Sequence, residues 1–367
     1  MEYKKFRVFA SCDIGPSIEL LRKRGYDVEV YPGPEAPSPE LLLEKVRGGI
    51  DGLITTLRDK IDAKVFEAGK GTLKGIAQFA VGFDNISRAD ADRYKIPFSN
   101  TADVLTDATA EFAFAILMDV SRKLWSSERL VRENRWEFWH PFLPFLGEEV
   151  TGKTIAVIGT GRIGQALISK CSGFEMNVIC YDTEYRNEKF ATSVQKVMDL
   201  RHELGISRRK NWIRYAEFDE CLHDADYVSL HVPLLREGEA RVPTWHLINE
   251  HTLQKMKKSA YLVNTSRGPV VDENALAKAL REGWIAGAAI DVFEREPLPE
   301  DSPLRDPKIE DRCRIFHHFA SGTTATRLSA DPNVGMAGRC VQGLIDMLEG
   351  SDYSKMPYVV NKEAFQK

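Results

Sequence analysis

The sequence has 367 residues, of which 43% are hydrophobic and 28% are charged, and its formal net charge at pH 7 is −4. This composition is ordinary for a globular protein, and the length suits about two domains. The basic residues form no long run, which argues against a nucleic-acid-binding surface and a polybasic membrane anchor. We therefore expect a small-molecule partner, no nucleic acid and no membrane.

Two features of the sequence bear on where the protein works. Residues 1–15 mix charges into a short apolar stretch without the long apolar core of a secretory signal, and no later run reaches the length of a membrane span. The six cysteines are scattered without CxxC spacing, which favours a reducing compartment and argues against a zinc cage. His246 and His251 lack HExxH spacing. We expect a cytoplasmic protein with no metal site.

The first 56 residues alternate short β-rich runs with helical patterns. We expect strands and helices in turn at residues 6–11, 16–25, 26–33, 38–49 and 51–56. Ser38 would cap the second helix with Pro39 in its first turn, and Gly25 and Gly48 lie where the helices should end. The βαβαβ order predicts a parallel sheet.

Residues 103–150 combine an apolar helical pattern with an aromatic segment. Between residues 103 and 124 the apolar positions predict a helix that is buried on more than one side. The segment after it contains Trp136 and Trp139 and is too apolar for a solvated loop. Because exposed apolar surface usually marks a contact, we expect a subunit interface here. The alternative is a segment packed on its own domain.

A glycine-rich motif follows an apolar strand in the segment TIAVIGTGRIGQALISK, which begins at Thr154. Gly159 would permit a tight turn, and Gly161 would let the backbone approach a pyrophosphate. Gly164 would allow close contact between helix and strand. The helix beginning with Arg162 and Ile163 would favour phosphate charge at its N-terminus. The motif predicts a dinucleotide site.

The next strand, NVICYD, ends in Asp182, which lies 18 residues beyond Gly164. An acid there accepts hydrogen bonds from the adenosine ribose and repels a 2′-phosphate, so NAD(H) is expected over NADP(H). Arg186 and the basic residues 208–210 leave NADP(H) open, because guanidinium groups can accommodate a phosphate. Residues 186–211 are expected to form an amphipathic helix and a basic loop inserted between two strands.

Three residues further along the chain match the needs of hydride transfer to a 2-oxoacid. Such a reaction requires a cation for the carboxylate and carbonyl, a proton donor, and a group that tunes the donor. Arg267, His318 and Glu296 are the candidates, and the first and last of these follow predicted strands. Read singly, each is equally consistent with a structural role, as a turn arginine, a buried histidine and a helix-end carboxylate.

The sequence resembles the D-2-hydroxyacid dehydrogenase family over nearly its whole length, and within it the glyoxylate and hydroxypyruvate reductases. The motifs that carry the resemblance are AVGFDNI from Ala80, NTADVLTDATAEFAFAIL from Asn100, the glycine motif, HVPL from His231, KMKKSAYLVNTSRG, GWIAGAAIDVFEREP and HHFAS.

The resemblance implies an α/β protein with two domains, Rossmann-like and flavodoxin-like, with parallel sheets and an active-site cleft between them. Residues 1–101, completed by residues 319–367, would bind substrate. Residues 102–318 would bind NAD(H), and residues 103–150 would form a homodimer.

The same resemblance implies roles for individual residues. Arg267 would bind the substrate carboxylate and polarise the carbonyl, His318 would be the acid and base, and Glu296 would hold and tune it. A nearby carboxylate favours the imidazolium form, so the set is chemically coherent. His317 is the alternative to His318 for this role, since the family usually has proline at the position of His317. The residues that follow, beginning with Phe319, match the family's motif in the register that makes His318 the acid and base.

The remaining implied contacts fall into two groups. Those to the cofactor are Val232, Pro233, Thr265 and Asp291, the last of which would meet the nicotinamide carboxamide. Those to substrate are Leu57, Val81, Gly82 and, from the neighbouring subunit, Trp139.

The function expected from these residues is reduction of glyoxylate or hydroxypyruvate with NADH. D-lactate, 3-phosphoglycerate and phosphite remain open as substrates. An NAD-sensing protein like the transcriptional corepressors of the same fold is the alternative from another class.

Overall fold

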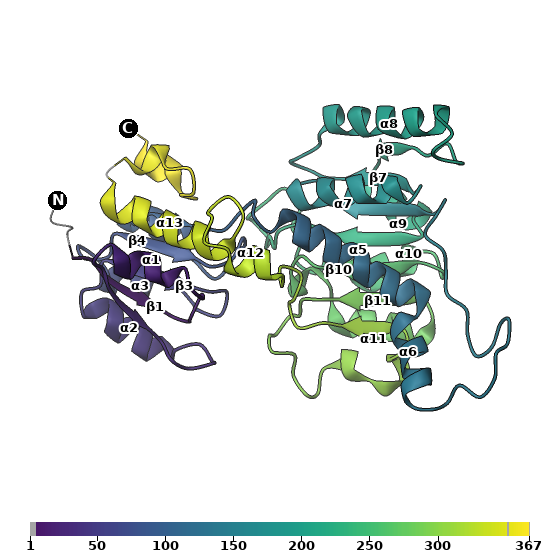
Figure 1. Ribbon diagram of the computed structural model, residues 1–367, viewed down its shortest axis with the longest axis horizontal. Helices are drawn as coiled ribbons and strands as arrows, with labels where there is room; N and C mark the ends of the chain where they lie inside the picture. Colours follow the sequence, from purple (N-terminus) through teal and green to yellow (C-terminus); the bar gives the residue numbers. More distant parts are fainter. Residues whose placement is uncertain (1–4, 351, 367) are drawn as a thin grey trace. The chain divides into compact units, whose positions relative to one another are not determined.

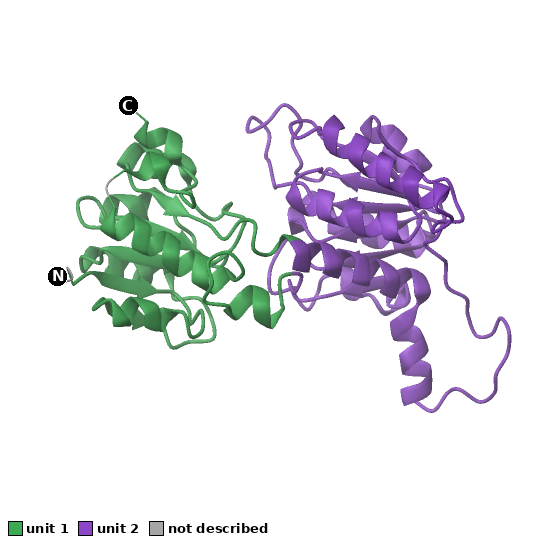
Figure 2. Ribbon diagram, turned by 45° about the horizontal axis from the view of Figure 1, so that its top comes forward, with its two compact units in different colours: residues 1–106, 321–367 green, residues 107–320 purple. Residues whose placement is uncertain are grey.

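The structure is a computed structural model that describes residues 5–350 and 352–366. It divides into two compact units (Figure 2), one made of Met1–Thr106 and Ser321–Lys367 and the other of Asp107–Ala320. We call them unit 1 and unit 2. Both contain a parallel sheet covered by helices, which confirms the expected α/β class (Figure 1). None of the described helices is long and apolar enough to cross a membrane.

Unit 1 is built on a parallel sheet with the strand order β2-β1-β3-β4-β5, which is the flavodoxin-like order. Its strands are β1 (Arg7–Ala10), β2 (Asp27–Val30), β3 (Gly52–Thr55), β4 (Gly75–Gln78) and β5 (Phe98–Ser99). Its helices are α1 (Ile18–Lys23), α2 (Pro39–Arg47), α3 (Ala63–Ala68), α4 (Arg88–Tyr94), α12 (Thr324–Leu328), α13 (Met336–Glu349) and the 3₁₀ turns η4 (Tyr353–Lys355) and η5 (Lys362–Phe365).

Alternation along the strands of unit 1 divides its core into two layers. Ala10, Ile54 and Ala77 face α1 and α13, whereas Phe9 and its neighbours on β3 and β4 face α2 and α3. The tail of the chain thus completes the N-terminal fold through α13. Ser38 caps α2, as expected, because its side chain accepts a hydrogen bond from the Leu41 amide at 3.2 Å.

Unit 2 is built on a parallel sheet with the order β12-β11-β10-β9-β6-β7-β8, the doubly wound dinucleotide-binding order with a strand added at one edge. Its strands are β6 (Thr154–Ile158), β7 (Asn177–Tyr181), β8 (Ile213–Tyr215), β9 (Tyr227–Leu230), β10 (Tyr261–Asn264), β11 (Gly287–Ile290) and β12 (Cys313–Ile315).

The helices of unit 2 cover both faces of its sheet. They are α5 (Thr106–Arg122), α6 (Leu124–Arg132), α7 (Arg162–Gly173), α8 (Glu188–Glu203), α9 (Phe218–Asp224), α10 (Glu250–Lys255), α11 (Glu273–Glu282) and the 3₁₀ turns η1 (Gly268–Val270), η2 (Pro303–Arg305) and η3 (Pro307–Ile309). The apolar helix α5 packs with α7 on one face, and α9, α10 and α11 pack on the other.

Residues 103–150 differ in detail from the expectation. The helix ends at Arg122, because Lys123 adopts a left-handed conformation with φ 55°, and α6 then begins at Leu124. Residues 135–150 contain no helix or strand, and Trp139 within them is 76% exposed in the single chain.

The expected amphipathic helix is present as α8, between β7 and β8. Its own residues Ala191, Val194 and Met198 form its buried side. The apolar pattern of residues 186–211 also includes Val197 and Leu204, and their burial, which this pattern predicts, is wrong, since they are 52% and 64% exposed.

Candidate active site

The glycine motif forms the turn between β6 and α7. Gly159 has φ +96°, and a Cβ on it would lie 2.7 Å from backbone atoms of His231. A Cβ on Gly164 would lie 2.1 Å from the Gly159 carbonyl oxygen, whereas Gly161 has no atom within 4 Å of its Cβ position. The turn is therefore packed on its inner side and open at the N-terminus of α7, where Arg162 and Ile163 begin the helix.

The segment after β9 lies directly against this turn. The amide nitrogen of Val232 is 2.9 Å from the Cβ position of Gly159, and Pro233 follows it. Burial lowers the pKa of His231 to about 4, so its ring is neutral, and Nε2 lies 2.8 Å from the Ser229 hydroxyl. The His231 ring is thus held against β9, directly before Val232 and Pro233 in the chain.

Asp182 follows β7 and is tied to the glycine turn. One carboxylate oxygen accepts hydrogen bonds from the Thr160 amide at 2.6 Å and the Thr160 hydroxyl at 3.3 Å. The other accepts from the amides of Glu184 and Tyr185 at 2.9 and 2.7 Å. The negative charge therefore lies where the sequence pattern predicts the adenosine ribose of a dinucleotide.

Thr160 and Tyr215 belong to the same polar cluster but were not predicted from the sequence. The Thr160 hydroxyl lies 3.0 Å from the Tyr215 hydroxyl, which accepts a hydrogen bond from the Asn187 amide at 2.8 Å. Thr160 occupies a variable position of the glycine motif, and Tyr215 lies far from it in sequence, so no local pattern marks either residue.

Arg267 follows β10 and precedes η1. Its carbonyl oxygen accepts a hydrogen bond from the Asn264 side chain at 2.9 Å, and Nη1 donates to the Ser266 carbonyl at 2.7 Å. Thr265 beside it is buried, and no described residue gives its hydroxyl a hydrogen bond. A buried hydroxyl without a protein partner leaves a hydrogen bond for a bound molecule or water, and Thr265 together with the open space at Gly161 therefore fits a bound dinucleotide.

Glu296 and His318 are in direct contact. Glu296 Oε2 lies 2.8 Å from His318 Nδ1, and Oε1 accepts a hydrogen bond from the Phe293 amide at 3.0 Å. Partial burial raises the pKa of Glu296, but the hydrogen bond and charge of His318, the Phe293 amide and the charge of Arg267 outweigh it and leave the pKa lowered. Glu296 is therefore an ionised partner for an imidazolium.

Asp291 fixes the backbone around His318. His318 has φ +55° and donates its amide to the Asp291 carbonyl at 2.8 Å. The buried Asp291 carboxylate accepts from the amides of Phe319 and Ala320 at 2.7 and 2.9 Å. Burial raises the pKa of Asp291 against these two hydrogen bonds. His317 is exposed and stacks on Phe319, with ring centroids 5.1 Å apart, so it is His318 that faces Glu296.

The expected substrate contacts Leu57, Val81 and Gly82 lie in unit 1, in the loops after β3 and β4. Asn85 joins the two loops, because its side chain donates to the carbonyls of Thr56 at 2.9 Å and Asp59 at 2.7 Å. The loops therefore meet at the carboxyl edge of the five-stranded sheet, where open parallel sheets bind ligands.

Comparison with protein families and known proteins matches both parts of the chain. The NAD binding domain of the D-isomer specific 2-hydroxyacid dehydrogenases matches residues 114–320, and the catalytic domain of the same family matches residues 14–209. The glyoxylate reductase of Korarchaeum cryptofilum is 41% identical over 325 residues, which is 88% of this chain and 89% of that protein. The glyoxylate reductase of Thermococcus litoralis is 38% identical over 363 residues, which is 98% of both.

The fold matches solved structures over almost its full length. The TT0316 protein from Thermus thermophilus superposes with a TM-score of 0.79 at 34% identity, covering 96% of this chain and 99% of that one. The glyoxylate reductase from Paecilomyes thermophila is 22% identical and shares the fold with a TM-score of 0.76. The superposition covers 98% of this chain and 99% of that one. The chain therefore belongs to the D-isomer specific 2-hydroxyacid dehydrogenase family and is an NAD-binding oxidoreductase.

Proposed function

We propose that the protein reduces glyoxylate or hydroxypyruvate to the corresponding hydroxyacid with NADH, and that it works in the cytoplasm. The observation that carries this proposal is the convergence of Arg267, Glu296 and His318 at the ends of β10, β11 and β12, which are neighbours in the sheet. The name glyoxylate reductase on relatives about 40% identical supports the choice of substrate. Six free cysteines, five of them buried, support a reducing compartment.

In this mechanism the chain supplies charge and a proton. NADH, when bound, supplies the hydride that reaches C2 of the 2-oxoacid. Arg267 binds the substrate carboxylate and polarises the carbonyl, and the His318 imidazolium gives its proton to the carbonyl oxygen. Glu296 holds the ring through Nδ1, and Nε2 would be the atom that meets the substrate. Leu57, Val81 and Gly82 would contact the substrate, and Asp291 the nicotinamide carboxamide.

The first test is NADH oxidation with a panel of 2-oxoacids, in wild type and in two histidine variants. We expect turnover with glyoxylate or hydroxypyruvate. His318→Gln should lower kcat about 100-fold or more, because a positioned acid contributes that much. His317→Gln, the matched control, should keep most of the activity.

Other results of this assay would contradict the proposal in distinct ways. Preference for pyruvate or a phosphorylated 2-oxoacid would contradict the proposed substrate. NADH binding without turnover would support the corepressor-like alternative. If His317→Gln is inactive and His318→Gln is active, the general acid is His317 and not His318.

The second prediction concerns pH. Because Glu296 is ionised and stabilises the imidazolium form, Glu296→Gln should move the alkaline limit of 2-oxoacid reduction to lower pH. Oxidation of the hydroxyacid needs the neutral ring, so its acidic limit should move the same way. The measurement is kcat/KM against pH in both directions, and unmoved profiles would contradict the coupling between Glu296 and His318.

The third prediction is a preference for NADH over NADPH. Asp182 would repel a 2′-phosphate, while Arg186 is paired with Glu188 at 2.6 Å and lies over the Tyr215 ring. Arg209 packs beside Gly152, before β6 and therefore at the sheet edge opposite the glycine turn. Asp182→Ala should lower kcat/KM for NADH by about 10- to 100-fold, the loss expected for a charged hydrogen-bonding group. A wild type that prefers NADPH would contradict the assignment.

The fourth prediction is a homodimer formed through residues 103–150. The support is a run of large apolar side chains that are more than half exposed in the single chain: Trp136, Phe138, Trp139, Phe142, Leu143 and Leu146. Sedimentation at micromolar concentration should give a dimer. Trp139→Ala should raise KM for the 2-oxoacid more than KM for NADH, if this side chain reaches the neighbour's substrate. A monomer, or equal effects on both KM values, would contradict the proposal.

A further inference from the structure

The loop that carries Arg267 and the loop that carries Glu296 are in direct backbone contact. A Cβ on Gly268 would lie 1.8 Å from the carbonyl carbon of Phe293 and 2.5 Å from the amide nitrogen of Glu294. No side chain fits between the two loops at this point. A shift of either loop would therefore move the other, and with it one of the two charged groups.

A reciprocal pair of hydrogen bonds between Glu273 and Glu294 joins the start of α11, which directly follows the Arg267 loop, to the Glu296 loop. Glu273 Oε1 accepts from the Glu294 amide at 2.7 Å, and Glu294 Oε1 accepts from the Glu273 amide at 3.2 Å. Glu273 is buried as the first residue of α11 and is also within 3.4 Å of the Ser302 hydroxyl. The carboxylate of Glu294, in contrast, is 31% exposed and needs another group to orient it.

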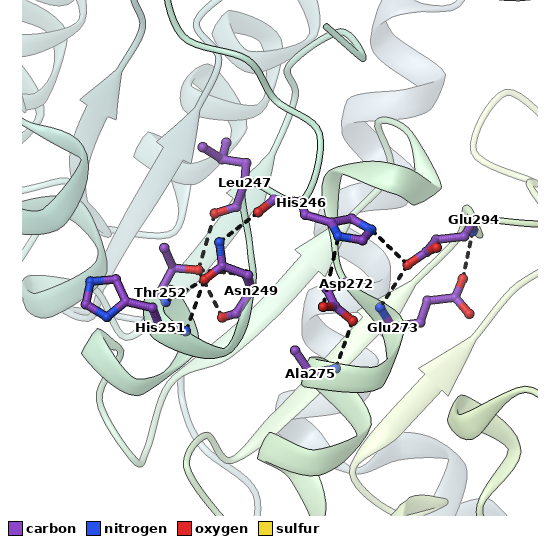
Figure 3. A network of polar contacts seen from close by, with 9 residues as sticks. All are labelled: His246, Leu247, Asn249, His251, Thr252, Asp272, Glu273, Ala275 and Glu294. Atoms are coloured by element: carbon purple, nitrogen blue, oxygen red, sulfur yellow. Dashed lines mark hydrogen bonds and ion pairs between the residues drawn. The ribbon is translucent and has the colours of Figure 1, made fainter. Parts of the chain in front are cut away.

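His246 supplies that group from a third segment (Figure 3). Its Nε2 atom is shielded from solvent and lies 3.2 Å from Glu294 Oε1, without hydrogen-bond geometry to any described residue, while Nδ1 lies 4.0 Å from Asp272 Oδ2. Its amide donates to the Pro269 carbonyl at 2.8 Å, inside the Arg267 loop. Trp245 stacks on the ring, with centroids 4.8 Å apart, and Arg236 covers Trp245.

We infer that His246 and Glu294 are positioning residues of the active site, which hold the Arg267 loop and the Glu296 loop in register. The inference rests on the proposed function, and it adds a layer of residues that touch neither substrate nor cofactor. His246 is joined to the first loop by its backbone and to the second by its ring. Asp272 and Glu273, at the start of α11, complete the connection.

A positioning role predicts a specific kinetic signature. If the loops move apart, Arg267 meets the substrate carboxylate poorly and Glu296 holds His318 poorly, so KM for the 2-oxoacid rises and kcat falls. The glycine turn after β6 and Asp182 after β7 belong to other loops, whereas only Thr265 and Asp291 among the expected cofactor contacts flank the two loops, so KM for NADH should rise much less than KM for the 2-oxoacid. Small misplacements of positioned groups are costly, and we expect kcat/KM for the 2-oxoacid to fall roughly tenfold or more.

The experiment compares four variants with wild type in steady-state kinetics at one pH. His246→Leu removes the ring nitrogens that face Glu294 and Asp272 and should show the full signature. Glu294→Gln keeps an oxygen for the Glu273 amide but removes the charge, and it should show the same signature if His246→Leu does not fold. His246→Gln, whose side-chain amide places a polar nitrogen within reach of Glu294, should recover much of the loss. His251→Leu is the matched control, because this histidine is exposed on α10 and points away from the network (Figure 3).

The outcomes separate this inference from the proposed function. A wild type without turnover on any 2-oxoacid would overturn both. An active wild type with His246→Leu indistinguishable from His251→Leu would overturn this inference alone. A fall in kcat with both KM values unchanged would also overturn it, because that pattern reports only a smaller fraction of folded enzyme.

Discussion

The hydrogen bond between Glu296 Oε2 and His318 Nδ1 depends on a single short stretch of chain, the residues that follow β11. That stretch begins with Asp291, whose backbone and side chain accept hydrogen bonds from three consecutive amides beginning with His318. It ends with Glu296, which holds the imidazole. A left-handed conformation costs a residue with a side chain roughly 1–2 kcal/mol, so His318 is held against its own backbone preference. The surrounding hydrogen bonds offset this cost and fix the ring.

The rest of unit 2 places charge around this pair. Because all its strands are parallel, their carboxyl ends share one edge, and β10 brings Arg267 beside the loop of Glu296. The glycine turn after β6 and Asp182 after β7 lie at the same edge. The residues for cofactor binding and for acid–base chemistry therefore lie at one edge of one sheet. At Gly268 two of the loops at this edge are in direct backbone contact, so that one cannot shift without the other.

Local patterns were sufficient to predict some of these features. The glycine motif and Asp182 act through fixed spacing within one strand–helix–strand unit, so the sequence contains the information needed to find them. The resemblance to the family identified Arg267, Glu296 and His318, because each lies in a recognisable motif. Ser38 is a local cap and could likewise be predicted.

Features that depend on distant contacts could not be predicted. Nothing local ends α5 at Arg122, since lysine is a good helix former, yet the break at Lys123 places the Trp125 ring beneath Arg314 from β12. The apolar periodicity predicts α8, but it does not predict which apolar residues of this helix are buried against unit 2. No local pattern marks His246 as a positioning residue, because its partner Glu294 lies 48 residues further along the chain.

The most direct test of the proposed site is a crystal structure with NAD and oxalate, a stable mimic of a 2-oxoacid. The prediction is that the Arg267 guanidinium binds the oxalate carboxylate and that His318 Nε2 lies roughly 3 Å from an oxalate oxygen, within reach for proton transfer. Glu296 should remain on Nδ1. Oxalate bound away from Arg267, or His318 turned so that Glu296 no longer holds Nδ1, would contradict the proposed roles of all three residues.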